Sequence, residues 1–511
     1  MDKWTITGGT FETGTGTEGS TTAKVTITAD TKVNVSFKAE VITPLSPTEF
    51  TVEMTHGEHG TVTASPVIPT NGKVAEDTEI TFTAAPASGY KVDKWTITGG
   101  TFEAGTGTEG SLTAKVKISA DTKVNVSFKT AMYTEVPFGT DGADLDNYLK
   151  TAVPDTNGIC YIKVTGLTAA DLKGDRSSQK PSPLGKILKY NPTKKVALKL
   201  SEVSGVTDMS SCFYKCTSLT QAPVIPSGVT NMQGCFSGCT SLTQAPVIPS
   251  TVTNMSWCFG GCKSLTQAPV IPSTVTNMNG CFSNCKSLTQ APVIPSSVAN
   301  MQYCFEFCTS LTQAPVILSG VTDMWSCFRN CTSLTQAPVI PSTVTNMGGC
   351  FGGCTSLTQA PEIPSGVTDM EDCFHGCKNL TQAPVIPSTV TNMQGCFYRC
   401  TSFIQAPEIP SGVTNMRYCF YGCTSLIQAP DIPSGVTGMH SCFEACKKIT
   451  AVTLKCNYNS ALVYGDPVFK DAFKNCEKLS AGSIKVPAGQ VQTYKDNAAK
   501  MGAQKEWFVA E

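Results

Sequence analysis

Apolar and polar residues alternate along the first quarter of the chain. Between residues 1 and 130 the runs TAKVTITA, KVNVSF and TEITFTA place an apolar side chain at every second position, and Gly, Asn and Asp separate the runs. A period of two between turn residues is typical of short antiparallel strands. The pattern therefore predicts all-β domains in this part of the chain.

These strands belong to a repeated unit. Residues 2–38 return almost unchanged at residues 93–129. The repetition predicts a truncated β-repeat at 1–39, a Pro-containing linker at 40–48 and a complete β-repeat at 49–130. Because the chain starts inside a unit, we expect the rest of that unit and an export signal to lie upstream.

The pattern changes after residue 130. The segments DLDNYLKTA and PLGKILKYN have helical spacing, whereas CYIKVTG and KVALKLS alternate as strands do. We expect residues 131–208 to form an N-terminal α/β cap, because the end unit of a stacked array would otherwise expose its core. Residues 479–511 contain a strand-like segment and an amphipathic helical segment, and they predict a C-terminal cap.

Residues 209–478 repeat with a period of 23 residues and form about twelve units. Eleven units carry two cysteines four residues apart, and a Phe follows the first of them. The first ladder consists of Cys212, Cys235, Cys258, Cys281, Cys304, Cys327, Cys350, Cys373, Cys396, Cys419 and Cys442, and the second runs from Cys216 to Cys446. In the twelfth unit Ala472 replaces the first-ladder cysteine. A period of this length predicts a solenoid.

One unit shows how the repeats are expected to fold. Positions i, i+3, i+4 and i+7 predict one face of a short helix, and they are held by Met232, Cys235, Phe236 and Cys239. A short strand is expected to follow, with its inward-facing side chains at Leu242, Ala245 and Val247. Cys235, Phe236, Cys239 and Leu242 are therefore the predicted core ladder.

Two sequence patterns resemble known families. The unit L-x-x-A-P-x-I-P-x-x-V-T-x-M-x-x-C-F-x-x-C-x-S resembles the BspA-like, Treponema-pallidum-type leucine-rich repeats. The β-repeat, with HGTVTASP and GYKVDKWTI, resembles internalin-B-type B-repeats of bacterial surface proteins, of the β-grasp type. The resemblance implies an α/β leucine-rich-repeat solenoid of 23-residue repeats behind all-β repeat domains.

The same resemblance implies a function. BspA-like proteins are bacterial adhesins at the cell surface or secreted, so the expected partners are host matrix proteins such as fibronectin or fibrinogen, host cells or other bacteria. Two alternatives stay open, namely a structural or antigenic surface-layer component without a specific receptor, and a carbohydrate-binding module.

The paired cysteines allow three interpretations. A metal site needs four donors, and C-x-x-x-C lacks the spacing of a zinc knuckle. Disulfides between turns require closer approach than packed helices allow, although glycine-rich turns could provide it. In the third interpretation both ladders are small buried apolar groups, as the alanine in the twelfth unit favours.

Composition removes several classes of function. The net charge is −1 and only 15% of the residues are charged, which gives no electrostatic basis for binding nucleic acid or an anionic membrane. No cysteine or serine has a recurrent His partner, and the four histidines lie in a turn (His56, His59) or at expected exposed repeat positions (His375, His440). We therefore expect a non-enzymatic protein with no cofactor, no metal and no transmembrane segment.

Variation between units marks a candidate binding surface. It concentrates at the two residues before each first-ladder cysteine and the two before each second-ladder cysteine, which are expected on the convex face. Trp, Tyr and Arg, which anchor protein interfaces, gather there. The candidates are Tyr214, Trp257, Tyr303, Phe307, Trp325, Tyr398, Arg399, Arg417, Tyr418 and Tyr421. Tolerant surface positions that drifted would give the same variation.

Two other candidate sites follow from the sequence. The almost invariant Thr-Gln pairs are expected to form a regular concave lattice, which could bind a glycan or a filament. Lys173, Gly174 and Asp175 form a tripeptide like those of integrin ligands, in a Pro/Ser-rich loop.

Overall fold

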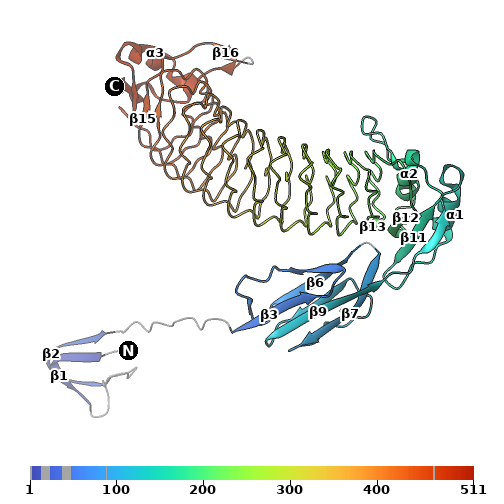
Figure 1. Cartoon of the computed structure of the whole chain (residues 1–511). Helices are drawn as coiled ribbons and strands as arrows, with labels where there is room; N and C mark the ends of the chain where they lie inside the picture. The colour runs from blue at the N-terminus through green and yellow to red at the C-terminus, as the bar shows by residue number, and fades with distance from the viewer. Residues whose placement is uncertain (1–2, 13–22, 37–47, 88, 464–465) are drawn as a thin grey trace.

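The computed structural model describes residues 3–12, 23–36, 48–87, 89–463 and 466–511. Strands β1 (Lys3–Phe11) and β2 (Val25–Ser36) form an antiparallel pair. Farther along the chain, a β-domain and an α/β cap precede a long curved array of stacked turns, and a second cap closes the array (Figure 1).

The complete β-repeat consists of two sheets. The first has the strand order β5-β3-β9-β7 and the second β4-β6-β8. Their bounds are β3 (Glu49–His56), β4 (Gly60–Ser65), β5 (Lys73–Ala75), β6 (Glu79–Pro86), β7 (Tyr90–Thr98), β8 (Thr113–Lys117) and β9 (Thr122–Thr130). Phe82, Trp95 and Val124 are buried between them. The pairing is antiparallel as predicted except between β3 and β9, which run parallel.

The N-terminal cap is a parallel sheet covered by two helices. Its strand order is β10-β11-β12-β13, with the bounds β10 (Thr134–Pro137), β11 (Ile159–Thr165), β12 (Lys195–Leu200) and β13 (Leu219–Gln221). The helices are α1 (Ala143–Thr151) and α2 (Pro183–Tyr190), and the 3₁₀ turns are η1 (Thr140–Gly142) and η2 (Ala169–Leu172). The apolar cluster of the cap continues into the repeats, because β13 belongs to the first of them.

The repeats contain no α-helix among the described residues between α2 and residue 490. Neighbouring units pair instead through single parallel bridges, such as Asn231 with Asn254 and Gln244 with Gln267. Apart from β13, the one strand assigned before residue 450 in the described part of the array is β14 (Asp431–Ile432). The partners of each bridge stand 23 residues apart, so each unit makes one complete turn.

The four predicted core-facing residues are buried, but the predicted short helix is wrong, because every second backbone N–H donates to a carbonyl of the next unit. Cys235 N donates to Met232 O at 3.0 Å within its own unit, whereas Phe236 N donates to Cys258 O at 2.8 Å in the next one. Asn231 Oδ1 accepts a bond from Gln233 N at 3.1 Å and so caps a turn. In a helix the backbone N–H groups donate to carbonyls of the same helix. Here about half of them donate to carbonyls of the next unit instead.

The predicted inward strand face is also wrong at one position. Val247 is 88% exposed, whereas Ile248 is 6% exposed. Pro246 is buried and breaks the ladder, so the inward side shifts by one residue after Ala245. The outer position thus carries a Val in seven of the units.

The core ladder is continuous along the array. Cys235, Phe236, Cys239 and Leu242 are fully buried. Phe236 stacks on Phe213 at 5.3 Å and on Phe259 at 5.6 Å between ring centroids, and the row continues in this way to Phe473. Each unit therefore buries its rings against its neighbours, as solenoids require.

All 25 cysteines are buried free thiols. The second-ladder thiols have a specific partner, because Cys239 Sγ donates to Phe213 O at 3.1 Å and the same bond recurs along the array. Among the described residues no group of three or more His, Cys, Asp or Glu side chains is arranged to hold a metal. The thiols thus act in the structure as small apolar groups, and those of the second ladder each donate one weak hydrogen bond.

A second parallel sheet closes the array, with the strand order β14-β15-β18-β19. The remaining bounds are β15 (Val452–Leu454), β16 (Leu462–Val463), β17 (Asp466–Pro467), β18 (Ile484–Val486), β19 (Phe508–Ala510), α3 (Val491–Asp496), η3 (Ala488–Gln490), η4 (Ala498–Met501) and η5 (Lys505–Trp507). Tyr494 of α3 is buried against Phe508. In the part of the chain that the structure describes, no helix has the length and apolar character to cross a membrane.

Candidate functional site

The four variable positions of each unit form one surface, which we call the turn face. It comprises the two residues before each first-ladder cysteine and the two before each second-ladder cysteine. The residue directly before each ladder cysteine has a positive φ, as in Gly234 (62°) and Gly238 (78°). This left-handed conformation suits glycine and costs other L-residues roughly 1–2 kcal/mol.

Several bulky residues occupy these left-handed positions. Trp257 has a φ of 57°, Tyr303 of 55° and Phe307 of 58°. Arg399 and Tyr418 have values of 54° and 57°. Gly, Asn, Asp and Ser hold most of the equivalent positions in other units, as the backbone conformation favours. The backbone conformation at these positions therefore disfavours the large side chains that occupy them.

Side chains at the left-handed positions lean over the next unit. A Cβ added to Gly280 would lie 2.5 Å from the Trp257 ring, and one added to Gly422 would lie 3.2 Å from Cγ of Arg399. Glycine at these two places thus leaves space for Trp257 and Arg399. The pairing is not general, because Ser326, Asn330 and Ser441 stand 23 positions after Tyr303, Phe307 and Tyr418.

One aromatic cluster lies in the first half of the array. Tyr303 lies 6.4 Å from Trp257 and 6.0 Å from Trp325 between ring centroids. The guanidinium of Arg176, from the cap, lies 5.6 Å from the Trp257 ring. Trp325 is 43% exposed, and Phe307 nearby in sequence is 42% exposed. This cluster therefore offers both ordered and accessible rings.

A second cluster lies in the later repeats. Tyr398 stacks on His375 at 4.6 Å and on Tyr421 at 4.7 Å, with only 7° between the two tyrosine rings. The exposed Arg399 places its guanidinium 5.4 Å and 5.9 Å from these two tyrosine rings. Tyr418 lies 6.4 Å from Tyr421. Cation–π contact and stacking thus order these side chains in advance.

The family of the chain follows from its repeats. A model of the BspA type leucine rich repeat region matches residues 208–335, 324–450 and 370–499, which together cover more than half of the chain. The chain belongs to the BspA-type leucine-rich repeat family. A model of the divergent InlB B-repeat domain matches residues 50–132. Both resemblances seen in the sequence are confirmed.

Solved leucine-rich repeat structures are similar to this BspA-type chain. A leucine-rich repeat protein from Bacteroides ovatus ATCC 8483 is 19% identical over 61% of this chain and 83% of its own, with a TM-score of 0.47. A leucine rich cell surface protein from Faecalibacterium prausnitzii A2-165 is 24% identical over 50% and 78%, with a TM-score of 0.35. A leucine-rich repeat protein from Eubacterium ventriosum ATCC 27560 is 22% identical over 55% of this chain and 82% of its own, with a TM-score of 0.36. The comparison with curated proteins finds no match.

Two residues expected on the surface of the BspA-type array are buried. Tyr214 is 6% exposed, because its hydroxyl donates to Gln179 Oε1 at 3.0 Å in a loop of the cap. His440 is 6% exposed, and the ring of Tyr418 lies 5.0 Å from it. The expectation of exposure was wrong for both, because neighbouring parts of the fold cover them.

The remaining candidates lie on the turn face. Trp257, Tyr303, Tyr398, Tyr418, Tyr421 and Arg417 are half-buried there. Arg417 N donates to Asn415 Oδ1 at 3.2 Å. Between the two clusters lies a unit whose four variable positions are all glycine, Gly348, Gly349, Gly352 and Gly353. The exposed and half-buried aromatic residues of the turn face thus form two groups, separated by a unit that carries only glycine at its four variable positions.

The cost of the left-handed positions can be measured at Phe307. Phe307→Gly is expected to be more stable than Phe307→Ala by about 1 kcal/mol, because both changes remove the ring and only glycine relieves the backbone. At neighbouring Glu306, which lacks the positive φ, glycine should be less stable than alanine by about 0.5–1 kcal/mol. Urea unfolding of the four variants tests this, and the same order at both positions would refute it.

An exposed row of apolar side chains, which the strand pattern did not predict, lies on another face of the array. Seven valines, one per unit, are 59–89% exposed, and they are Val224, Val247, Val270, Val293, Val316, Val339 and Val385. Acidic residues stand at this position in the units of Glu362, Glu408 and Asp431. We call this row the valine face. The strand pattern had placed these valines inside.

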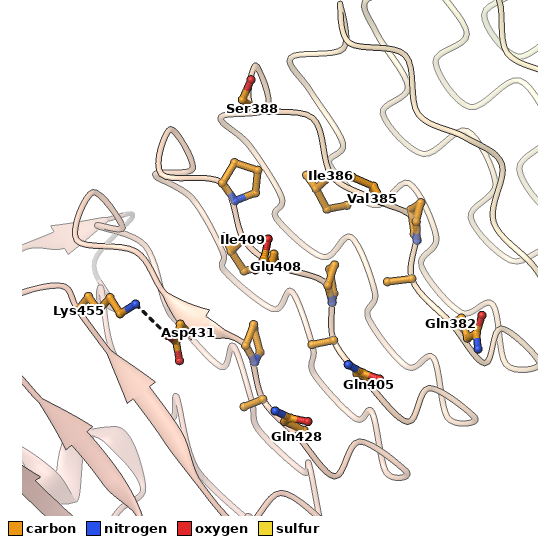
Figure 2. Close-up of a pocket in the computed structure, with 17 residues that line it drawn as sticks. Gln382, Val385, Ile386, Ser388, Gln405, Glu408, Ile409, Gln428, Asp431 and Lys455 are labelled. Atoms are coloured by element: carbon orange, nitrogen blue, oxygen red, sulfur yellow. Dashed lines mark ion pairs between the residues drawn. The ribbon is translucent and has the colours of Figure 1, made fainter. Parts of the chain in front are cut away.

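The valine face deepens into an open groove of about 980 Å³ near its C-terminal end. Figure 2 shows Gln382, Gln405 and Gln428 on three successive turns that line the groove. Asp431 pairs with Lys455 at 2.8 Å at the end of the groove. The groove is thus lined by apolar and acidic side chains as well as by the Gln residues of the predicted Thr-Gln lattice.

The integrin-like tripeptide is engaged in its own loop. Ser177 and Ser178 donate hydrogen bonds to the Asp175 carboxylate, and these bonds hold its pKa well below the usual range. Lys173 Nζ pairs with Asp208 Oδ2 at 3.0 Å. Both charged groups therefore have partners inside the protein.

Proposed function

We propose that this chain is a non-catalytic bacterial cell-surface adhesin that binds a protein partner through the aromatic clusters of its turn face. The observation that carries the proposal is the presence of Trp257, Tyr303, Phe307 and Tyr418 in the left-handed conformation. Backbone strain of this kind persists where the side chain is needed. Drift without selection would instead favour Gly and Asn at these positions.

The composition and order of the clusters suit a protein partner. Trp, Tyr and Arg supply most of the binding energy in protein interfaces. Tyr398 and Tyr421 are already stacked and held by Arg399, so binding would cost little additional side-chain entropy. Trp325 and Phe307 offer accessible rings for a partner to cover.

Binding to immobilised fibronectin and fibrinogen tests the proposal, because the family resemblance implies these partners. The full chain is compared with Trp325→Ala and with Tyr398→Ala/Tyr421→Ala. Each variant is expected to lose at least about tenfold in affinity if its cluster is an anchor. Circular dichroism checks that each variant is folded.

A matched control lies on the valine face. Val339→Thr/Val385→Thr changes two side chains that are 89% and 87% exposed and should leave binding unchanged. Loss of binding in this control alone would move the interface to the valine face. Binding that withstands the aromatic changes, or the absence of binding to both proteins and to host cells, would refute the proposal and favour a structural surface component.

A further inference from the structure

The complete β-repeat is joined to the cap by an apolar contact. Leu112 packs against the apolar core of the β-repeat and also against a second, smaller buried cluster. Among the described residues, Leu112 is the one that contacts both clusters. The second cluster consists of Ala131, Ile159, Tyr161 and Ala197, with Tyr133 packed on it. Tyr133 meets Tyr161 edge to face at 5.5 Å. Leu112 thus bridges two folded parts.

Polar contacts fix the same junction at two further points. Asn157 Nδ2, in the cap, donates to Gly110 O at 2.6 Å. Gln221 Nε2, in the first leucine-rich repeat, donates to Tyr90 O at 3.0 Å and to Pro86 O at 3.4 Å. Gln221 is only 5% exposed, whereas Gln428 near the other end of the array is exposed. Contacts at three separate places restrict both bending and rotation.

The two copies of the β-repeat differ at the residue that makes the apolar contact. Over the aligned segments 2–38 and 93–129, four pairs differ, namely Thr13/Ala104, Thr21/Leu112, Thr26/Lys117 and Thr28/Ser119. Ala104, Lys117 and Ser119 are exposed. Of the four differing residues in the second copy, Leu112 is the one that packs at the junction. The equivalent residue of the first copy is Thr21, which lies outside the described residues.

We propose that the second β-repeat is a fixed elbow that sets the direction of the leucine-rich repeats, and that Leu112 is the residue that makes it one. Domains joined in one chain move relative to each other unless their interface is apolar and well packed. The elbow holds the turn face in a constant orientation relative to the β-repeat.

Leu112→Thr in the full chain tests this directly, because it installs the residue of the other copy. Chymotrypsin cleavage after Tyr133 requires the junction to open, and we expect it to become at least about tenfold faster. Small-angle X-ray scattering should show a broader distribution of distances. Ala104→Thr, the same kind of exchange at an exposed position, should match the wild type in both measurements.

A second variant keeps the test valid if Leu112→Thr disturbs the β-repeat itself. Asn157→Ala/Gln221→Ala removes the two polar contacts from the cap and the first repeat and leaves every β-repeat residue in place. This variant, like Leu112→Thr, is expected to be cleaved faster by chymotrypsin and to show a broader distribution of distances in small-angle X-ray scattering. Wild-type cleavage and scattering in both variants would overturn the proposal.

Discussion

Raising the pH from 8 to 10 in reducing buffer is expected to unfold the leucine-rich repeats while the β-repeat stays folded. The reason lies in the buried cysteine ladders. Burial raises the pKa of Cys308, Cys377 and Cys423 to about 12, and it raises that of Cys235, Cys281 and Cys327 well above the ordinary value of 9.0. The same direction holds along both ladders from Cys239 to Cys446.

The sign of the effect follows from proton linkage. The folded state holds its thiol protons more tightly than the unfolded state, so the contribution is fully present below the unfolded pKa near 9.0 and is lost progressively as the pH rises from there to the folded pKa of about 12. Each buried thiol then costs about 1.4 kcal/mol per pH unit. Roughly twenty such thiols remove on the order of 20 kcal/mol or more by pH 10, which exceeds the 5–15 kcal/mol that usually holds a domain together.

The chain contains its own control for alkaline unfolding. The complete β-repeat has no cysteine, since the first in the sequence is Cys160. Circular dichroism and thiolate absorbance should therefore report one steep transition from the repeats, with strand signal remaining. Cys281→Ala/Cys304→Ala/Cys327→Ala should make the transition less steep, as Ala472 shows that alanine fits this ladder. Repeats that stay folded above pH 10, or an unchanged steepness, would contradict the linkage.

Phe305→Ala is expected to destabilise the array by about 3–5 kcal/mol. Phe305 is fully buried and lies 5.6 Å from the ring of Phe282 and 5.5 Å from that of Phe328. Loss of the ring opens a cavity and weakens the contacts to both neighbouring units. Because the stability of a solenoid depends on contacts between neighbours, we also expect the array to unfold in two steps.

The matched control for this change stands two residues away. Phe307 is 42% exposed and has a positive φ, so Phe307→Ala should change stability by no more than about 1 kcal/mol. Urea unfolding of the two variants, followed by circular dichroism, measures the difference. Equal losses at the two positions would show that the stacked Phe row does not carry the stability of the array.

The sequence by itself determined the order of parts and the core of each unit. A buried position must recur once per turn, so the row of Phe236 and the two cysteine ladders could be identified from their period alone. The change of apolar spacing after residue 130 predicted the cap that precedes the repeats. The 23-residue unit with its Phe and two cysteines also indicated the family. The aromatic enrichment at the variable positions was also visible, and among these residues Tyr214 is buried by the cap.

Only the tertiary structure decided the backbone path within a unit. The spacing of Met232, Cys235 and Phe236 fits a helix, but the partner of the Phe236 N–H lies 22 residues ahead, in the next turn. A local pattern cannot show a hydrogen bond to another unit. For the same reason it could not reveal that Val247 faces outward after the strand is interrupted at Pro246.

The contacts of the candidate surface likewise needed the fold. Trp257 and Tyr303 belong to units two turns apart, and the fold brings their ring centroids to 6.4 Å from each other in a tilted arrangement. A loop of the cap buries Tyr214, and the junction gives Leu112 a role that its place in the β-repeat does not suggest. Sequence periodicity therefore determined which residues recur, whereas contacts between distant segments decided which of them are strained, covered or exposed.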